Sequence, residues 1–460
     1  MSSAASARWV LAVLLLGVLI GALDIAIVGP ALPDLGAAFG VDERSLSWVV
    51  GIFVLFNLIG APALAKLSDR VGRQRSYTLC LGLFVAGSTI VAFAPSFAVL
   101  LFGRAVQGIG AGGIFPVASA VVADLFPAER RGRVLGLIGA VFGLAFVLGP
   151  VLGGLLLPIG WHWLFLINVP IGLVLIVVAG RVLPRATVER RGRFDGIGVM
   201  LLAGALLLIG FGLNGVDAER GIEGLLALRV WPCLLAGLSL YAALNRIEGR
   251  ASDPVLPPAM WRGQLRLIAS IAVIAGIVEA AMVFLPAMAV VSFGVTPATA
   301  SFMLLPLVAA LIVGAPSAGI LLDHVGARPV IQVGICLIGI GLLVFGIGGV
   351  VRSTFYGAGG LIGLGLASLI GAPLRHAALR EVGPEDRGAS QGWLTLHLGS
   401  GQLIGAALIG GIVASSAGGG VAGFQRAMLT LACGCAVGLL LSTGLRGGKT
   451  IELGEPEARS

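Results

Sequence analysis

Four ionisable side chains lie deep inside long apolar stretches of this 460-residue sequence. They are Asp24, Arg104, Glu279 and His397. A charge at the middle of a bilayer costs roughly 2.5 to 3.5 kcal/mol on the insertion scale, so such residues normally face a protein interior or a water-filled cavity. A carboxyl group there can bind and release a proton as its surroundings change, and an acid near an arginine can form an ion pair. The chemistry that we expect is therefore proton binding and charge pairing.

Uncharged polar side chains accompany these four residues inside the apolar stretches. They are Asn57, Gln107, Asn168, Gln332 and Gln402. His397 has Gln402 five residues further on, a pattern more typical of a hydrogen bond between helices than of a proton relay. Cys433 and Cys435 would point about 200° apart on one helix, which favours packing over metal binding. We therefore expect neither a metal site nor a cofactor.

The composition excludes a single soluble core. Apolar residues make up 58% of the sequence and charged residues 11%, and the mean hydropathy is +1.05. Apolar runs of about 20 residues, long enough to cross a hydrocarbon layer of roughly 30 Å, follow one another nearly to the end. The sequence therefore predicts an all-α polytopic membrane protein with no room for an enzymatic domain. It contains no GxxxxGK(S/T) loop, which indicates that ATP does not drive it directly.

Fourteen apolar spans can be placed along the chain. The first six cover residues 9–31, 46–65, 76–95, 98–123, 134–157 and 163–183, the next two 194–214 and 227–245, and the last six 267–291, 298–322, 329–351, 354–374, 388–414 and 424–445. This order predicts a six-helix bundle at 1–186, a two-helix insert with its flanking loops at 187–262, and a second six-helix bundle with a short tail at 263–460.

The distribution of Lys and Arg predicts the orientation in the membrane. If the chain starts in the cytoplasm, most of its 30 Lys and Arg residues lie in inner loops and tails. Those in outer loops are Arg44, Arg220, Arg229, Arg352 and Arg426. This excess is what the positive-inside rule expects, so the net charge of +8 indicates orientation and not a nucleic-acid partner. Both termini should be cytoplasmic, and the first apolar run, with no persuasive cleavage site, should be an uncleaved helix.

A short charged turn between apolar runs occurs twice. The two copies are AKLSDRVGRQR at 65–75 and GILLDHVGARP at 319–329. They align Asp69 with Asp323 and Gly72 with Gly326, at an offset of 254 positions. Such a repeat indicates that one membrane unit was duplicated, as in transporter folds whose halves enclose a central substrate path.

A similar offset relates residues inside the apolar spans. Gly149 lies 256 positions before Gly405, and Asp24 lies 255 positions before Glu279. We therefore expect the two acids to face one cavity from the first helix of each half, where they could couple proton movement to substrate movement. Asp24 and Arg104 lie at similar depths, so we also expect them to pair, which lowers the cost of burying each charge. The alternative is that either acid only pairs with Arg104 or with a neighbouring helix.

Several motifs occur in order along the chain. They are LDIAIVGPALP at 23–33, LSDRVGRQR at 67–75, LLFGRAVQGIGAG at 100–112, GPVLGG at 149–154, WHWLFLINVPIG at 161–172 and FDGIGVMLL at 194–202. The series resembles the major facilitator superfamily, and more narrowly its 14-helix drug/proton antiporter branch. In the first motif Gly29 and Pro30 replace the usual Asn-Val, and Ala65 stands where Gly is usual before the charged turn.

The resemblance implies a role for the charged turns. In the family, the turn around Asp69 lies near helix ends of the other half and helps to latch one access state. The residues that this implies here are Asp69, Gly72 and Arg73, with Asp323 and Gly326 in the repeat. The alternative is that the turns only anchor the chain at the cytoplasmic face.

The resemblance also identifies GPVLGG as the antiporter motif. Gly149, Pro150, Gly153 and Gly154 would give a membrane helix small faces and a kink, because small residues allow close helix approach and Pro frees a carbonyl. Packing alone would explain the glycines equally well. The second half lacks the motif, since Ala406 stands opposite Pro150.

These observations predict a proton-coupled secondary transporter that exports small hydrophobic or cationic compounds across a bacterial inner membrane by alternating access. Asn57, Gln107 and His397 are the polar residues expected beside the charged ones along the path. The expected partners are a small-molecule substrate, protons and membrane lipid, with a periplasmic adaptor left open. The alternatives are an exporter of a defined metabolite, such as an amino acid, sugar or natural product, and a receptor or assembly subunit that transports nothing.

Overall fold

The computed structural model describes residues 3–126, 134, 137, 141, 144, 145, 148–183, 196–217, 220, 223, 224, 226–248, 263–347, 351–370, 372–382, 387–416 and 420–446. The regular elements that these residues form are α-helices, which confirms the expected all-α class. The chain divides into two compact units. Unit 1 comprises Met1–Pro258, Glu279–Leu305 and Gln402–Ala427, and unit 2 comprises Ala259–Val278, Pro306–Gly401 and Met428–Ser460.

The helices of unit 1 come mainly from the first half of the chain. They are α1 (Ser3–Phe39), α2 (Glu43–Val71), α3 (Arg73–Ala92), α4 (Phe97–Leu125), α6 (His162–Leu166), α7 (Asn168–Val182), α8 (Gly196–Asn214), α10 (Trp231–Glu248) and the short α12 (Pro297–Phe302). Unit 2 contains most of α13 (Leu305–Val325), with α14 (Ala327–Ile347), α15 (Arg352–Ile370) and α16 (Ala372–Leu379). Three long helices contribute to both units: α11 (Gly263–Phe293), α17 (Arg387–Ser415) and α18 (Val421–Ser442).

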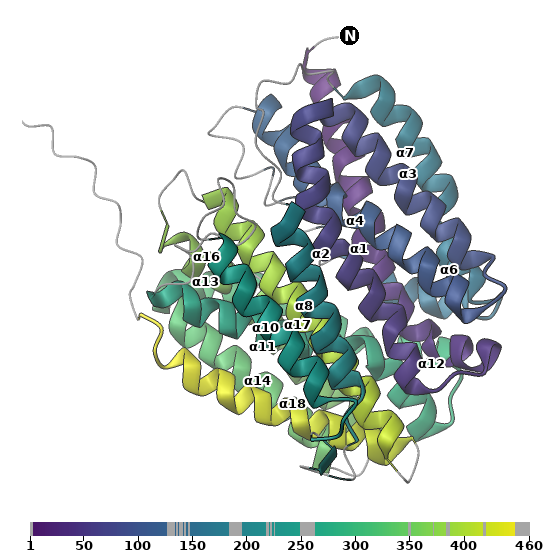
Figure 1. Ribbon diagram of the computed structural model, residues 1–460, viewed down its shortest axis with the longest axis vertical. Helices are drawn as coiled ribbons and strands as arrows, with labels where there is room; N and C mark the ends of the chain where they lie inside the picture. Colours follow the sequence, from purple (N-terminus) through teal and green to yellow (C-terminus); the bar gives the residue numbers. More distant parts are fainter. Residues whose placement is uncertain are drawn as a thin grey trace, which may run out of the picture. The chain divides into compact units, whose positions relative to one another are not determined.

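In unit 1, helix α4 packs against both α2 and α3, and α7 packs against α3 and α1 (Figure 1). Helix α8 packs against α2, and α10 packs against α8. The end of α8 is fixed to α2 by Asn214, whose Nδ2 donates to the Ser47 hydroxyl at 2.8 Å and to the Arg44 carbonyl at 3.1 Å. The segment predicted as an insert therefore packs directly on the α2 side of this unit.

Glycines bring α2 and α4 into backbone contact. Gly108 and Gly112 lie one turn apart on α4, and a Cβ added at either would collide with a carbonyl oxygen of α2, that of Phe53 or Asn57. Close approach through small residues spaced four apart is a common way for membrane helices to pack. These two glycines therefore hold α4, which carries Arg104, at a short distance from α2.

We expect Gly112→Ala to lower the unfolding temperature of the purified protein, because the new methyl group would meet backbone atoms, including the Ala61 nitrogen at 3.0 Å. Overpacking of this kind costs about 1 to 3 kcal/mol. The matched control is Gly82→Ala on α3, where an added Cβ has no neighbour within 4 Å. Alanine is the better helix former by about 1 kcal/mol, so the control should be neutral or stabilising. Equal effects of the two substitutions in a thermal unfolding assay would contradict the packing argument.

Both charged turns contain a single glycine between two helices. Helix α2 continues to Val71 and α3 begins at Arg73, so Gly72, with φ +92°, is the only residue between them. Gly326, with φ +83°, has the same place between α13 and α14. Each glycine donates its N–H to the carbonyl four residues earlier, at 3.1 Å and 2.9 Å. The matching geometry supports the internal repeat, and the positive φ explains why glycine is required.

The charged stretch of residues 65–75, expected to be a turn between two helices, is itself mostly helical. The helix extends six residues beyond the predicted end of the second span at residue 65, because a helix satisfies its own backbone hydrogen bonds wherever the side chains allow it. The apolar run therefore indicated where the chain is apolar and not where the helix ends.

In unit 2, helix α14 packs against α15, and α16 packs against both. Small residues again permit close contact: a Cβ at Gly334 on α14 would lie 2.7 Å from the Ser368 side chain of α15. A Cβ at Gly363 would collide with the Leu307 carbonyl oxygen of α13. Unit 2 therefore uses the same kind of glycine contact as unit 1.

By length and composition, twelve helical segments of the described residues could cross a membrane. Together they support a multi-pass membrane protein. The span predicted at 227–245 corresponds to α10, whose apolar part, Trp231–Leu244, is shorter. Nine of the 24 residues in the span predicted at 134–157 lie outside the described residues. The fourteen-helix count and the boundaries 1–186, 187–262 and 263–460 therefore stay predictions.

Candidate functional site

The centre of the candidate site is an ion pair between two buried side chains of unit 1. Asp24 on α1 and Arg104 on α4 are both almost completely shielded from solvent. The Nη1 atom of Arg104 donates a hydrogen bond to Oδ2 of Asp24. The pairing expected from their depths in the sequence is therefore confirmed. Because neither charge reaches water, each depends on the other for compensation.

Two amides complete the hydrogen bonding of the Asp24 carboxylate. Gln107, one turn after Arg104 on α4, donates from Nε2 to Oδ1 of Asp24 at 2.6 Å. Asn168, the first residue of α7, donates from Nδ2 to the same oxygen at 3.3 Å. Gln107 also accepts from Nη1 of Arg104 at 2.6 Å, and its Nε2 lies 2.8 Å from the hydroxyl of Ser88 on α3. Both oxygens of Asp24 therefore accept hydrogen bonds.

The guanidinium group of Arg104 also contacts α2 and lies near two aromatic rings. Its Nε donates to the Val49 carbonyl oxygen at 3.0 Å. Its Cζ lies 4.2 Å from the ring centre of Phe53 and 5.8 Å from that of Phe165, distances at which a cation is attracted to a π-face. One arginine therefore links residues from α1, α2, α4 and α6, while its amide neighbours add α3 and α7.

A change of charge at Asp24 would disturb this network. A proton on Asp24 would turn one acceptor oxygen into a donor and remove the counter-charge of Arg104. Removing one partner of a buried pair costs about 3 to 5 kcal/mol, because the other charge stays buried. The arrangement can therefore link proton binding to the packing of several helices.

Glu279 lies on α11 and is also buried, with 8% of its surface exposed. Helices α1 and α11 cross where Gly29 meets Val283, since a Cβ on Gly29 would collide with the Val283 carbonyl oxygen. Asp24 and Glu279 precede this crossing by five and four residues, about 7.5 and 6 Å along their helices at about 1.5 Å per residue. The two acids therefore lie within about one and a half turns of the same crossing, each on its own helix.

The glycines of the GPVLGG motif at 149–154 form close contacts with α1 and α12. A Cβ on Gly149 would lie 2.6 Å from that of Ala26, and one on Gly153 would lie 3.0 Å from the Ser301 hydroxyl. A Cβ on Gly154 would overlap the ring of Phe302. Pro150 lies inside the same helical stretch, residues 148–156. The small faces expected from the sequence are therefore used for packing.

Of the residues predicted to act as a latch, Arg73 contacts both α2 and α4. Its Nε donates to Oδ2 of Asp124, near the end of α4, at 3.0 Å, and its Nη1 donates to the Ser68 hydroxyl at 2.6 Å. Asp323 is exposed. The Asp69 side chain lies outside the described side chains. The contacts of Arg73 link the start of α3 to the ends of α2 and α4.

Two further predicted polar residues, Asn57 and His397, belong to different units. Asn57 is half-buried on α2, and its backbone faces Gly108 and Gly112 of α4. His397 is buried on α17 in unit 2, with Nδ1 2.8 Å from the Trp393 carbonyl oxygen one turn earlier. This nitrogen therefore has a partner within its own helix. The expected bond between helices stays a prediction.

The partners that the sequence analysis missed include Ser88, which contacts Gln107, and Asp124, which accepts from Arg73. Serine is common in membrane helices, so the composition carried no signal for Ser88. Asp124 carried a signal in the sequence, because it is an acid at the end of the fourth span and close to the Arg-rich segment at 130–133. The sequence indicates Asn168 only as a polar residue inside an apolar stretch. Its contact with Asp24 joins residues 144 positions apart and depends on the folded structure.

The model of the Major Facilitator Superfamily matches residues 14–309. This chain belongs to the major facilitator superfamily. Among its superfamily relatives, the uncharacterized MFS-type transporter YfiU of Bacillus subtilis is 33% identical over 399 residues, covering 85% of this chain and 77% of YfiU. The multidrug resistance protein Stp of Mycobacterium tuberculosis is 30% identical over 405 residues, 87% of this chain and 74% of Stp.

A solved superfamily structure agrees with the fold. The bacterial homologue of the human lysosomal transporter Spinster, in an inward-facing and occupied conformation, has a TM-score of 0.66 at 16% identity, covering 95% of this chain and 96% of that one. The motifs predicted a resemblance to the multidrug efflux type of the major facilitator superfamily. Relatives named multidrug resistance proteins confirm this resemblance. The chain is therefore a major facilitator transporter with a buried acid and arginine network.

Proposed function

We propose that this major facilitator protein is a proton-coupled exporter of small hydrophobic or cationic compounds, with both termini cytoplasmic in a bacterial inner membrane. The observation that carries the proposal is the buried Asp24–Arg104 pair, in which both carboxylate oxygens accept hydrogen bonds. Burying an acid and a base inside the membrane costs free energy, so such residues usually have a function, and proton relay is a common one. The multidrug resistance name of a relative with 30% identity supports the substrate class.

In the proposed cycle, Asp24 is the switch. While it is ionised, it holds Arg104 and, through Gln107 and Asn168, parts of α4 and α7. When it takes a proton, the guanidinium loses its counter-charge and is stable only in a conformation that gives it water or another acid. A few kcal/mol is enough to move an equilibrium between two access states from one side to the other, so one proton can bias the cycle.

Glu279 is the proposed second acid, in the equivalent position on the first helix of the second half. A substrate cation close to its carboxylate would favour the ionised form, whereas a dry cavity would favour the protonated form. Exchange of a proton for a cation at this residue would then require only that the cavity open alternately to each side.

The glycine contacts are the proposed sliding surfaces. Gly29 and Gly149 meet Val283 and Ala26 with no side chain of their own, so the helices can shift without disengaging interlocked side chains. Pro150, Gly153 and Gly154 would extend this surface. At the predicted cytoplasmic side, the turns with Asp69, Gly72, Arg73, Asp323 and Gly326 would act as latches.

Transport in inverted membrane vesicles tests the proposal. Respiration acidifies their lumen, so an exporter driven by proton antiport should accumulate a cationic dye such as ethidium inside. We expect at least tenfold accumulation over vesicles without the protein, and its loss when an uncoupler is added. A panel of neutral compounds, amino acids and sugars separates multidrug export from export of a defined metabolite, an alternative that the low aromatic content of 7% favours. Uncoupler-insensitive accumulation would contradict proton coupling.

A further inference from the structure

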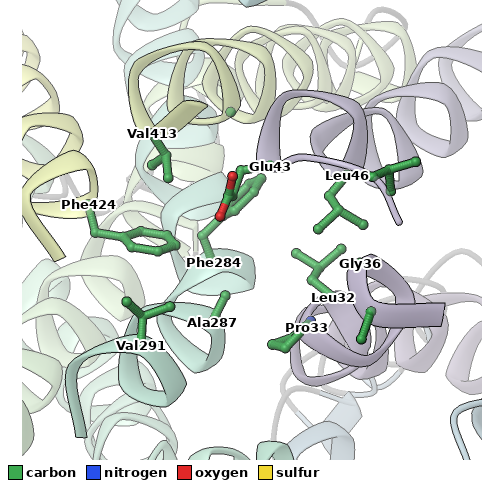
Figure 2. A pocket seen from close by; sticks show the side chains of 13 residues that line it. Leu32, Pro33, Gly36, Glu43, Leu46, Phe284, Ala287, Val291, Val413 and Phe424 are labelled. Atoms are coloured by element: carbon green, nitrogen blue, oxygen red, sulfur yellow. The ribbon is translucent and has the colours of Figure 1, made fainter. Parts of the chain in front are cut away.

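A cavity of about 230 Å³ lies in unit 1, where α1, α2, α11, α17 and α18 meet (Figure 2). Its walls are almost entirely apolar. They include Leu32, Phe284, Ala287, Val413 and Phe424. Among the described residues that line it, Glu43 is the single one with an ionisable side chain. The cavity is therefore an apolar space with one acidic group in its wall.

Glu43 is the first residue of α2 and is half-buried. Within the described part of the chain, its carboxylate has neither a salt bridge nor a hydrogen bond. The positive end of the α2 dipole stabilises a negative charge at this position. The preceding residue, Asp42, caps the helix by accepting from the Ser45 N–H at 3.0 Å. Partial burial alone would raise the pKa of Asp42, but the hydrogen bonds from Ser45 and the nearby Arg44 outweigh it and lower the pKa.

We propose that this cavity binds a small organic cation with a single positive charge, held by Glu43. The lone carboxylate fits one positive charge, and the apolar walls fit the carbon skeleton that carries it. The rings of Phe284 and Phe424 provide π-faces for an ammonium group. A metal ion is a poor match, since Ca²⁺ requires six to eight oxygen ligands and Mg²⁺ is held mainly by oxygens. Typical ligand pockets measure roughly 300 to 1,000 Å³, so the occupant should be at the small end of drug-like molecules.

The site is separate from the Asp24 network. Leu32 lies eight residues after Asp24 on α1, about 12 Å along the helix at about 1.5 Å per residue. Under the proposed orientation, the cavity is at the outer end of the helices, beside the α1–α2 connection. The inference rests on the proposed function in assigning it a role: a cation released from the central path would meet Glu43 before leaving the protein.

Equilibrium dialysis of the purified full-length protein with radiolabelled phenyltrimethylammonium tests the site. The background is Glu279→Gln, so that this acid does not contribute, while Asp24 stays paired with Arg104. We expect saturable binding of one equivalent, an affinity at least tenfold lower with Glu43→Gln added, and partial recovery with Glu43→Asp. Ala287→Leu, which fills the cavity and leaves the charge in place, should also lower the affinity at least tenfold.

The matched control is Glu223→Gln, which removes the same charge from an exposed position in the segment between α8 and α10. It should leave the affinity within twofold. Gel filtration and thermal unfolding verify that each variant is folded. Unchanged affinity with either Glu43→Gln or Ala287→Leu, or equal loss with Glu223→Gln, would overturn the proposal. Dialysis involves no proton gradient, so failure of proton-coupled export in vesicles leaves this result independent, and the reverse also holds.

Discussion

Arg104→Ala should abolish proton-driven dye accumulation and lower the free energy of unfolding by about 3 to 5 kcal/mol, the usual cost of breaking a buried ion pair from one side. The substitution leaves Asp24 buried with its two amide donors but without a counter-charge. It also removes the Nε bond to the Val49 carbonyl and the contact with the Phe53 ring. Dye accumulation in inverted vesicles and chemical unfolding in detergent measure the two effects.

A double-mutant cycle separates pairing from independent contributions. Asp24→Asn alone should abolish uphill export, and the combined variant should be destabilised by less than the sum of the two single changes. Residues in contact typically couple by about 0.5 to 3 kcal/mol. The control Arg266→Ala removes an exposed arginine at the start of α11 and should change stability by less than about 0.5 kcal/mol. Additive effects of Arg104→Ala and Asp24→Asn would show that the pair does not act as a unit.

Glu279→Gln should abolish uphill export while the protein still exchanges dye down a concentration gradient. The amide has nearly the shape of the acid but cannot exchange a proton, so substrate would move without being coupled to proton flow. We expect accumulation to fall at least tenfold, to the level seen with an uncoupler. Dye counterflow in proteoliposomes with equal pH on both sides should retain at least a third of the wild-type rate.

Two comparisons make this result specific to the position of the acid. Glu279→Asp keeps a titratable group and should retain measurable uphill export, whereas Glu223→Gln, at an exposed site, should behave as wild type. If Glu279→Gln still accumulates dye in an uncoupler-sensitive manner, Glu279 is a structural residue. If counterflow is lost as well, the Glu279 carboxylate is also needed for substrate binding or for folding.

The membrane class and the central charge pair followed from the sequence. Long apolar runs have one stable outcome in lipid, the helix, because the backbone must satisfy its hydrogen bonds within the segment. The expected pairing of Asp24 with Arg104 needed only their depths in the spans and the cost of leaving either charge alone. The repeated turns could also be recognised, since glycine at Gly72 and Gly326 is required by a positive φ.

The partners around that pair could not be read from the sequence. Gln107 follows Arg104 by three residues and is its neighbour on any helix, but Ser88 and Asn168 reach the pair only because α3 and α7 pack beside α4 and α1. Contacts of this kind depend on how each helix is rotated about its axis. A sequence that is apolar on nearly every face carries little information on that rotation.

The glycines show most clearly which information the sequence carries and which only the folded protein carries. Seventy-two glycines make this residue type uninformative when it is read along the chain. In the folded protein, Gly82 has no neighbour within 4 Å of an added Cβ, while at Gly29 the same Cβ would collide with the backbone of Val283. By itself, the sequence determined that the chain crosses the membrane repeatedly and which buried charges must be compensated. Only the tertiary structure decided which small residues are contact points, because that depends on the backbone of another helix.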